Sequence, residues 1–347
     1  MKNIKNIIYF CNAEKGASGG AKIIYHHSEI INNLNNFTSE VLHIKKKKTS
    51  KWKASIIKKL DIKSNNETGW KLDQIEPYKN FKYNWFKNNV TVKNNFNFHE
   101  KTDFVILPEI FAHLADDLLI KNKIKYAIFV QNGYAISSTN NKKKLNKAYN
   151  KASFILSYSE DVNQCIKLLF PHLKKKIIKV KCSVDSNKFN SNQKKINLIT
   201  YMSRKLPQHS GHVLFFLKKI LPKNWIVKDL NNLSEKKVFK NLCRSKIFLS
   251  FSNLEGLGLP AIEAAIAGNF VVGYTGEGGK EYWKKPIFTE IYSGDIKNFV
   301  NEILKKVLEK NKNKLKKIIQ RKKIIKEFSK ENEVKHIKSF LGILIKV

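Results

Sequence analysis

Two glutamates, Glu255 and Glu263, stand eight positions apart in a chain whose other segments are dominated by lysine and asparagine. Glu255 follows a strand-like apolar run. Glu263 falls one turn into a helix that Pro260 can open, because proline at a first helical position loses no needed donor. Free amides at the start of that helix, with Gly256 and Gly258 allowing close approach to the backbone, predict a binding place for a phosphate or a sugar hydroxyl. The alternative interpretation is an acidic helix N-terminus that only compensates the helix dipole.

This segment resembles the signature of the retaining GT-B glycosyltransferases, especially of the large GT4 family: it reads EGLGLPAIE from 255 to 263 and continues AAIAGNFVVGYTGEGG. The resemblance implies that Glu255 contacts the sugar of a nucleotide diphosphate sugar and that Glu263 binds the ribose of the nucleotide. It also implies backbone contacts with this donor from Gly256, Leu257, Gly258 and Leu259.

A second part of the resemblance follows the apolar run 196–203. Members of the family usually have a glycine and an arginine there, with a lysine a few residues later, and the two basic groups hold the donor diphosphate. Here Arg204 and Lys205 are adjacent, so Arg204 is the stronger candidate and Lys205 the weaker. Nearly all basic residues of the chain are lysine, so an arginine at this position indicates a role for the planar guanidinium group, which can bind a phosphate through two N–H donors. The alternative is a surface salt bridge.

The resemblance extends to two places in the first half of the chain. A strand-like run is followed by a glycine loop, Gly16-Ala-Ser-Gly-Gly20, and in the family this loop lies near the donor phosphate and the acceptor, which makes Gly19 and Gly20 candidate contacts. A later strand-like run ends at Gln131 and Asn132, where family members often have a histidine beside the donor sugar. Amides can bind sugar hydroxyls but take up no proton at neutral pH, so a step that depends on histidine is not expected here.

Two further glutamates are predicted to face the same region. Glu109 follows a buried strand-like run and has no assigned role, and Glu281 either touches the donor or caps a helix. No metal site is predicted, because the family generally needs no divalent metal and the sequence has no DxD motif in a strand-loop context. The histidines also form no HExxH or similar set: His26, His27, His113, His209 and His212.

Apolar runs that alternate with helical patterns position these residues, and this alternation is typical of parallel α/β units. Strands are predicted at 6–11, 39–44, 103–107, 125–131, 153–157, 177–180, 196–203, 225–230, 246–252 and 269–275. Helices are predicted at 21–35, 110–121, 161–170, 212–221, 234–243 and 260–267. The segment from about 51 to 101 is predicted to hold loops and one more strand.

The predicted fold class is therefore α/β, GT-B, with two Rossmann-like doubly wound domains that face a central cleft. Residues 1–185 form the acceptor-side domain and residues 196–310 the nucleotide-sugar-binding domain. Residues 311–347 form a helical tail that packs in the core or crosses back onto the first domain. Ligands of such folds bind beyond the carboxyl ends of the strands.

The formal net charge of +38 first suggests a nucleic-acid or membrane partner. However, only three of the 66 basic residues are arginine, and joint enrichment of lysine, asparagine and isoleucine is what an AT-rich coding sequence produces. We therefore expect a weak attraction to anionic lipid and no nucleic-acid partner.

The four cysteines show no CxxC pair, and the apolar run near the N-terminus is too short for a signal peptide. A cytoplasmic protein is therefore expected, at most peripheral at the inner face of the membrane.

The implied function is a glycosyltransferase of polysaccharide biosynthesis. It would move a hexosyl-type unit from a nucleotide diphosphate sugar to a glycan or lipid-linked acceptor, with retention and without a cofactor. Two alternatives remain open at this point. One is a sugar-nucleotide epimerase, because the same fold hosts other chemistry. The other is a nucleic-acid-binding protein driven by charge alone.

Overall fold

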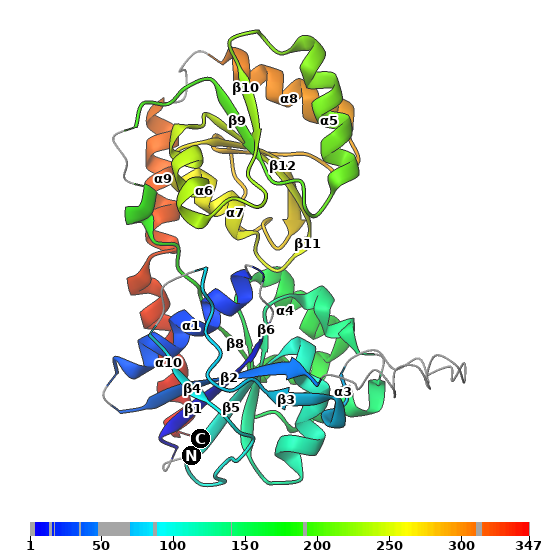
Figure 1. Cartoon of the computed structure of the whole chain (residues 1–347), viewed down its shortest axis with the longest axis vertical. Coiled ribbons are helices and arrows are strands. Elements are labelled where there is room, and N and C mark those ends of the chain that lie inside the picture. The colour runs from blue at the N-terminus through cyan, green and yellow to red at the C-terminus, as the bar shows by residue number, and fades with distance from the viewer. Residues whose placement is uncertain are drawn as a thin grey trace, which may run out of the picture. The chain divides into compact units, whose positions relative to one another are not determined.

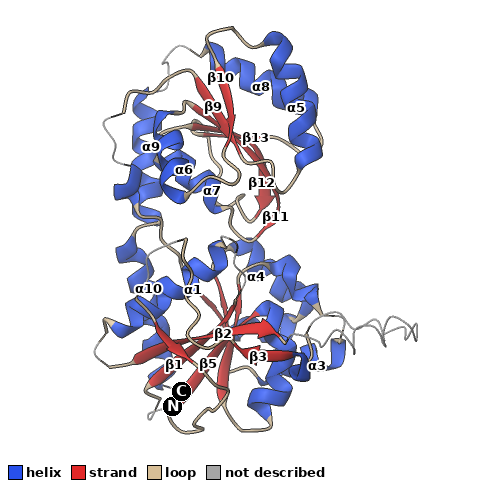
Figure 2. Ribbon diagram, viewed as in Figure 1, coloured by secondary structure: helices blue, strands red, loops and turns tan. Residues whose placement is uncertain are grey.

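The computed structural model describes residues 4–13, 16, 18–34, 36–47, 70–85, 89–139, 141–189, 193–309 and 314–346. The chain divides into two compact units, each built from a β-sheet with helices packed on it (Figures 1 and 2). The first unit comprises Met1–Tyr158, Val162–Val180 and His336–Val347, and the second comprises Ser159–Asp161 and Lys181–Lys335. The predicted helical tail is thus divided, since its last residues are counted with the first unit.

The first unit is built around an eight-stranded sheet. Its strands are β1 (Asn6–Asn12), β2 (Thr38–Lys46), β3 (Ile75–Pro77), β4 (Thr91–Lys93), β5 (Asp103–Pro108), β6 (Lys125–Val130), β7 (Phe154–Ser157) and β8 (Ile177–Lys179). They lie in the order β3-β2-β1-β5-β6-β7-β8, with β4 also paired to β2, and every pair is parallel except β2 with β3. Strands of a parallel sheet are buried on both faces, which explains the apolar runs: residues 7–10 of β1 have no exposed surface.

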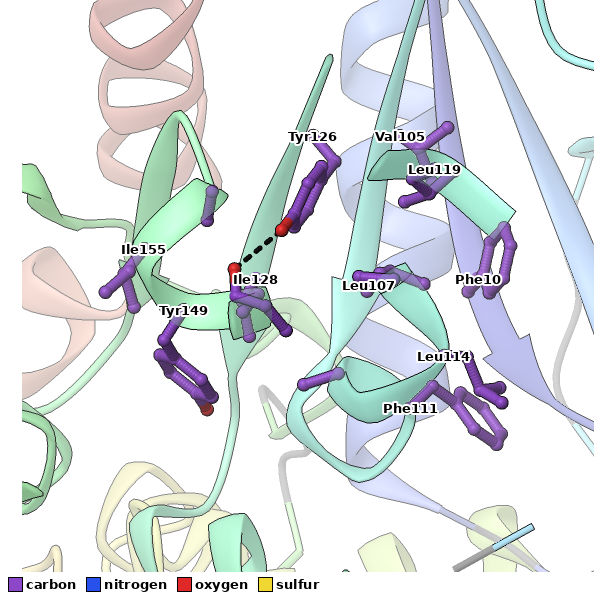
Figure 3. Close-up of a cluster of buried hydrophobic side chains, with 14 of the residues drawn as sticks. Phe10, Val105, Leu107, Phe111, Leu114, Leu119, Tyr126, Ile128, Tyr149 and Ile155 are labelled. Carbon is purple, nitrogen blue, oxygen red and sulfur yellow. Dashed lines mark hydrogen bonds between the residues drawn. The ribbon is translucent and has the colours of Figure 1, made fainter. Parts of the chain in front are cut away.

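Helices and short turns of helix flank this sheet. The α-helices are α1 (Gly19–Asn32), α3 (Lys142–Lys151), α4 (Glu160–Leu169) and the end of α10 (Lys330–Lys346). Phe10 and Leu107 from the sheet pack with Phe111, Tyr126 and other buried side chains in one core, in which the Tyr126 hydroxyl donates to the Ala148 carbonyl of α3 at 2.6 Å (Figure 3).

The second unit has a five-stranded parallel sheet in the order β10-β9-β11-β12-β13. The strands are β9 (Leu198–Tyr201), β10 (Ile226–Asp229), β11 (Ile247–Glu255), β12 (Phe270–Glu277) and β13 (Phe288–Glu290). The helices are α5 (Pro207–Ile220), α6 (Glu235–Arg244), α7 (Leu259–Ile266), α8 (Ile296–Leu308) and α9 (Lys314–Glu327). Helices α5 and α8 pack together over β12, and α7 packs on α6 and α9 on the other side of the sheet (Figure 1).

Each predicted strand overlaps an observed one, so these predictions are confirmed. The helix predicted at 110–121 was wrong in kind: this stretch is a 3₁₀-helix, η2 (Glu109–Leu114), followed by a π-helical turn, η3 (Asp116–Ile120). The pattern missed α3 and β13, and the segment from 51 to 101 holds two short strands, β3 and β4, among its described residues. In the part of the chain that the structure describes, we find no helix with the length and apolar content needed to cross a bilayer.

Candidate functional site

The loop between β11 and α7 positions the glutamate and glycine motif. Gly258 precedes α7 with a φ of 78°, in the left-handed region that suits glycine, and no side chain caps the helix there. The Tyr282 hydroxyl lies 2.9 Å from the Leu257 carbonyl oxygen and 3.0 Å from that of Gly258. An anionic ligand needs hydrogen-bond donors, so any backbone contact that this loop makes with one would come from its N–H groups.

Glu263 is the fifth residue of α7 and is half-buried. Its neighbours Ala261, Ile262 and Ala264 form the buried side of the helix. The first turn of α7 contains no acidic residue. The alternative that these glutamates only compensate the helix dipole is therefore not supported, because the effect falls off within the first turn.

The turn after β12 packs directly on the start of this loop. The Gly278 amide donates to the Glu255 carbonyl at 3.1 Å, and a Cβ atom on Gly278 would lie only 2.2 Å from the Gly256 carbonyl oxygen. Gly276 has a φ of 66°, and a Cβ atom there would lie 2.8 Å from the Ser252 Cβ atom. The second group of glycines in the motif thus allows two backbone segments to touch, which holds Glu255 in place.

Substitution of Gly278 by alanine tests this contact. The new methyl group would overlap a backbone oxygen, which cannot rotate away, so we expect Gly278→Ala to lower the free energy of unfolding by about 1–3 kcal/mol. Gly211→Ala is the matched control, because apart from the adjoining backbone of its own helix α5 no atom lies within 4 Å of its Cβ position. The control should be neutral or slightly stabilising, since alanine is the better helix former. Equal unfolding midpoints for both variants in urea would contradict the prediction.

Lys205 and Glu255 are brought together from the ends of two neighbouring strands. The Lys205 Nζ atom lies 3.3 Å from the Glu255 Oε1 atom, and both side chains are partly exposed. The loop that carries Lys205 is tied to the end of β10, because the Ser203 hydroxyl donates to Asp229 at 2.9 Å and accepts from Asn231 at 2.6 Å. In the sequence Lys205 was the weaker candidate beside Arg204, and no sequence signal indicated this ion pair.

Arg204 has a different environment from Lys205. Its side chain is exposed, and it forms no ion pair or hydrogen bond with any other residue that the structure describes. The surface salt bridge weighed as an alternative for this arginine is therefore not formed within the described residues. The five N–H donors of its guanidinium group, which no described residue engages, remain available to an anionic ligand.

Glu281 is engaged by the backbone. Its Oε2 atom accepts a hydrogen bond of 2.8 Å from the Glu160 amide, and both residues belong to the second unit. This hydrogen bond to a main-chain amide is the kind of contact that the capping alternative predicts.

In the first unit, the predicted residues surround a buried carboxylate. Glu109 is only 4% exposed, and its two oxygens accept from the amides of Gln131 at 3.0 Å and Asn132 at 3.1 Å. The Gln131 side chain in turn donates to the Gly20 carbonyl at 3.0 Å, and the Asn132 side chain accepts from the Tyr134 amide at 3.0 Å. Glu109, to which the sequence assigned no role, therefore holds the turn that carries both amides.

Gly19 and Gly20 are the first two residues of α1. A Cβ atom on Gly20 would lie 2.4 Å from the Gln131 Oε1 atom, so glycine is what lets the amide lie against this backbone. The hydrogen bond between them joins the start of α1 to the end of β6, and the predicted contacts of the first unit form one group.

The carboxylate of Glu109 makes the stability of the first unit depend on pH. Burial raises its pKa from 4.5 to about 7, although the two amide contacts act in the opposite direction. Between these values the folded state holds a proton that the unfolded chain lacks, so we expect stability to fall by up to about 3 kcal/mol as pH rises from 4.5 to 7.

Melting temperatures measured between pH 4.5 and 7.5 check this slope. Glu109→Gln should flatten the slope and also lower stability at every pH, because an amide can accept from only one of the two backbone donors. Glu100→Gln, which changes an exposed glutamate of the same unit, should leave the slope unchanged. A parent-like slope in Glu109→Gln would show that another group titrates.

No family model matches the sequence, and no curated protein matches it. The fold, however, is similar to solved structures. A mutant of S. aureus TarM in complex with fondaparinux, α-GlcNAc-glycerol and UDP matches with a TM-score of 0.62 at 12% identity, over 96% of this chain and 99% of that one. HepE of Anabaena in complex with UDP-glucose matches with 0.64 at 10% identity, over 97% and 99%. The catalytic domain of starch synthase IV from Arabidopsis thaliana, bound to ADP and acarbose, matches with 0.59 at 9% identity, over 99% and 100%.

These matches extend over nearly the whole chain. The chain therefore has the two-domain, Rossmann-like GT-B fold, and the predicted fold class is confirmed.

Proposed function

We propose that the chain is a retaining glycosyltransferase of the GT4 type, which moves a hexosyl unit from a nucleotide diphosphate sugar to a glycan or lipid-linked acceptor. The observation that carries the proposal is the ion pair of Lys205 with Glu255 in the second unit. It lies at the ends of two strands, where α/β folds bind ligands. Glu255 also begins the loop that leads to the start of α7, which no side chain caps. A carboxylate can accept from sugar hydroxyls, and a cation can hold a diphosphate.

Each residue has a role in this proposal. Glu255 orients the donor sugar, Glu263 binds the ribose hydroxyls, and Arg204 binds the diphosphate, with Lys205 as a second cation. The N–H groups of residues 256–259 and the start of α7 add hydrogen bonds to the same phosphates. The acceptor attacks the donor sugar on the same face from which the diphosphate departs, so the configuration is retained. The enzyme's contribution is mostly positioning and stabilisation of the charge that develops on the leaving diphosphate.

The first unit adds contacts to the donor and the acceptor. Gly19 and Gly20 would offer backbone at the start of α1, and the amides of Gln131 and Asn132 would bind sugar hydroxyls. Their support is the hydrogen-bonded group around Glu109 described above, which holds both amides in a defined geometry. Glu281 stays a weaker candidate, because its carboxylate already accepts from a backbone amide.

We also propose that transfer needs no metal. The cations in the proposed site are the side chains of Arg204 and Lys205, which can neutralise a diphosphate without a bound ion. Among the described residues, no three His, Cys, Asp or Glu side chains are grouped so that they could hold a metal. Turnover should therefore be the same in excess EDTA as in excess Mg²⁺, and loss of turnover in EDTA would contradict this part of the proposal.

Two measurements test the proposal. In a thermal-shift screen with UDP, ADP, GDP and dTDP, the cognate nucleotide should raise the melting temperature, since ligand at a hundred times its Kd stabilises the folded state by about 2.7 kcal/mol. UDP and ADP come first, because they occur in the similar structures.

Release of free nucleotide from the matching nucleotide sugar should then require an acceptor. A sugar-nucleotide epimerase would instead alter the sugar without an acceptor and without this release. A failure of all four nucleotides to shift the melting temperature would reject the proposed site itself.

A further inference from the structure

Helix α9 (Lys314–Glu327) has one face that is fully engaged with the second unit. Ile324 on this face is only 4% exposed. Three polar side chains beside it each have a partner in the unit: Arg321 Nε donates to the Ile266 carbonyl at 2.6 Å, Gln320 accepts from the Ile287 amide at 2.9 Å, and Lys317 Nζ lies 3.6 Å from the centre of the Phe270 ring. These contacts fix which side of α9 faces outward.

The opposite face carries three exposed aliphatic side chains. Leu315 is 71% exposed, Ile318 43% and Ile319 47%. A helix turns by about 100° per residue, so these three positions lie on one side, opposite Ile324, and their spacings of three and four residues make them neighbours. Exposed aliphatic side chains are common singly, whereas these three neighbours on one helix form a contiguous apolar patch.

Lysines surround this aliphatic group. Lys322 and Lys326 lie on the same side of the helix, and Lys323 borders it; all three are exposed and form no ion pair or hydrogen bond with any other described residue. The sole acidic residue of α9, Glu327, is already paired with Lys181 at 2.6 Å. A groove beside α9 adds another lysine, Lys335, and also contains Glu331. The outer face therefore combines apolar surface with an excess of positive charge.

We propose that this outer face of α9 docks the protein on an anionic phospholipid bilayer. Leu315, Ile318 and Ile319 enter the boundary between headgroups and acyl chains, and the lysines contact the lipid phosphates, as in amphipathic helices that lie in the membrane interface.

The positive charge of this face, together with its apolar side chains, favours an anionic bilayer over other partners. A second copy of the chain would bring like charges together, and like charges across an interface repel. A nucleic acid would leave the aliphatic group against a polar backbone, which gains nothing from it. The inference does not depend on the proposed glycosyl transfer, because it concerns a face to which that proposal assigns no residue.

Sedimentation of the full chain with lipid vesicles tests the proposal. We expect binding to vesicles of phosphatidylcholine with phosphatidylglycerol, weakening as salt rises, and little binding to phosphatidylcholine alone. The triple variant Lys322→Gln/Lys323→Gln/Lys326→Gln should lower the partition coefficient roughly tenfold or more. The variant Leu315→Gln/Ile318→Gln/Ile319→Gln should lower it by a similar factor, on the order of tenfold, at equal charge.

Two matched control variants test whether exposed lysines or exposed apolar side chains elsewhere on the protein contribute equally to vesicle binding. Helix α3 has three exposed lysines without partners among the described residues, so Lys142→Gln/Lys143→Gln/Lys151→Gln removes the same charge elsewhere. Helix α5 has three exposed apolar side chains, and Phe215→Gln/Phe216→Gln/Ile220→Gln removes as many of them. Both controls should keep most of the vesicle binding, and circular dichroism should show all four variants folded.

Three results would overturn the proposal. The first is an equal loss of binding in a control and in its α9 counterpart, which would make the attraction non-specific. The second is no binding to phosphatidylglycerol vesicles even at low salt. The third is vesicle binding that ignores the aliphatic substitutions and is displaced by RNA, which would assign this face to a nucleic acid.

Discussion

Glu255→Gln is expected to lower sugar transfer roughly a hundredfold to a thousandfold, the range typical of removing one group that stabilises a transition state. Glutamine has the same size but no charge, so it accepts more weakly from sugar hydroxyls and no longer attracts Lys205, whose Nζ atom lies 3.3 Å away in the ligand-free chain. Nucleotide binding and the melting temperature should change little, because this exposed ion pair contributes little to stability. Steady-state turnover and calorimetric nucleotide binding measure the two effects separately.

Glu277→Gln is the matched control for this substitution. Glu277 is the direct neighbour of Glu255 in the register of β11 and β12, and it too is ion-paired with a lysine, Lys280, at 2.6 Å. The proposal assigns Glu277 no contact with the donor, so its glutamine variant should turn over like the parent. Normal turnover in Glu255→Gln would reject the assignment, and so would an equal loss in both variants.

Arg204→Ala is expected to cost about 2–3 kcal/mol of donor binding or transition-state stabilisation, which corresponds to roughly a hundredfold in kcat/KM. The arginine is exposed and has no partner among the described residues, so its removal should not lower the melting temperature. A loss of kcat/KM without a loss of stability would therefore report a contact with the donor. Arg204→Lys should restore only part of the activity, because an ammonium group lacks the bidentate fork.

Arg244→Ala serves as the control, since it removes another exposed arginine from the same unit, at the end of α6. It should leave kcat/KM unchanged. If both Arg204 variants turn over like the parent, the diphosphate is held elsewhere. Lys205→Ala then becomes the decisive variant, because Lys205 is the cation that forms an ion pair with Glu255.

The alternation of apolar runs with helical patterns was sufficient to predict the α/β class and the positions of ten of the thirteen strands that the structure describes. Strands that are buried on both faces must be apolar nearly throughout, as residues 7–10 of β1 are, and this is a local property that a single sequence displays. The helix predicted at 110–121 was wrong in kind for a related reason. Over six residues, repeats of 3.0 and 3.6 residues per turn place apolar side chains at nearly the same positions, so the pattern cannot separate a 3₁₀-helix from an α-helix.

The sequence by itself determined the fold class and the place of the glutamate and glycine motif, because these depend on residue types within a few positions of one another. Only the tertiary structure decided which distant groups meet. Lys205 pairs with Glu255, Glu109 accepts from the amides of Gln131 and Asn132, and Gly278 touches the backbone of the loop after β11. Each of these contacts joins the ends of different strands, and strand order and register, which bring those ends together, are set by packing across the whole sheet and leave no local signal.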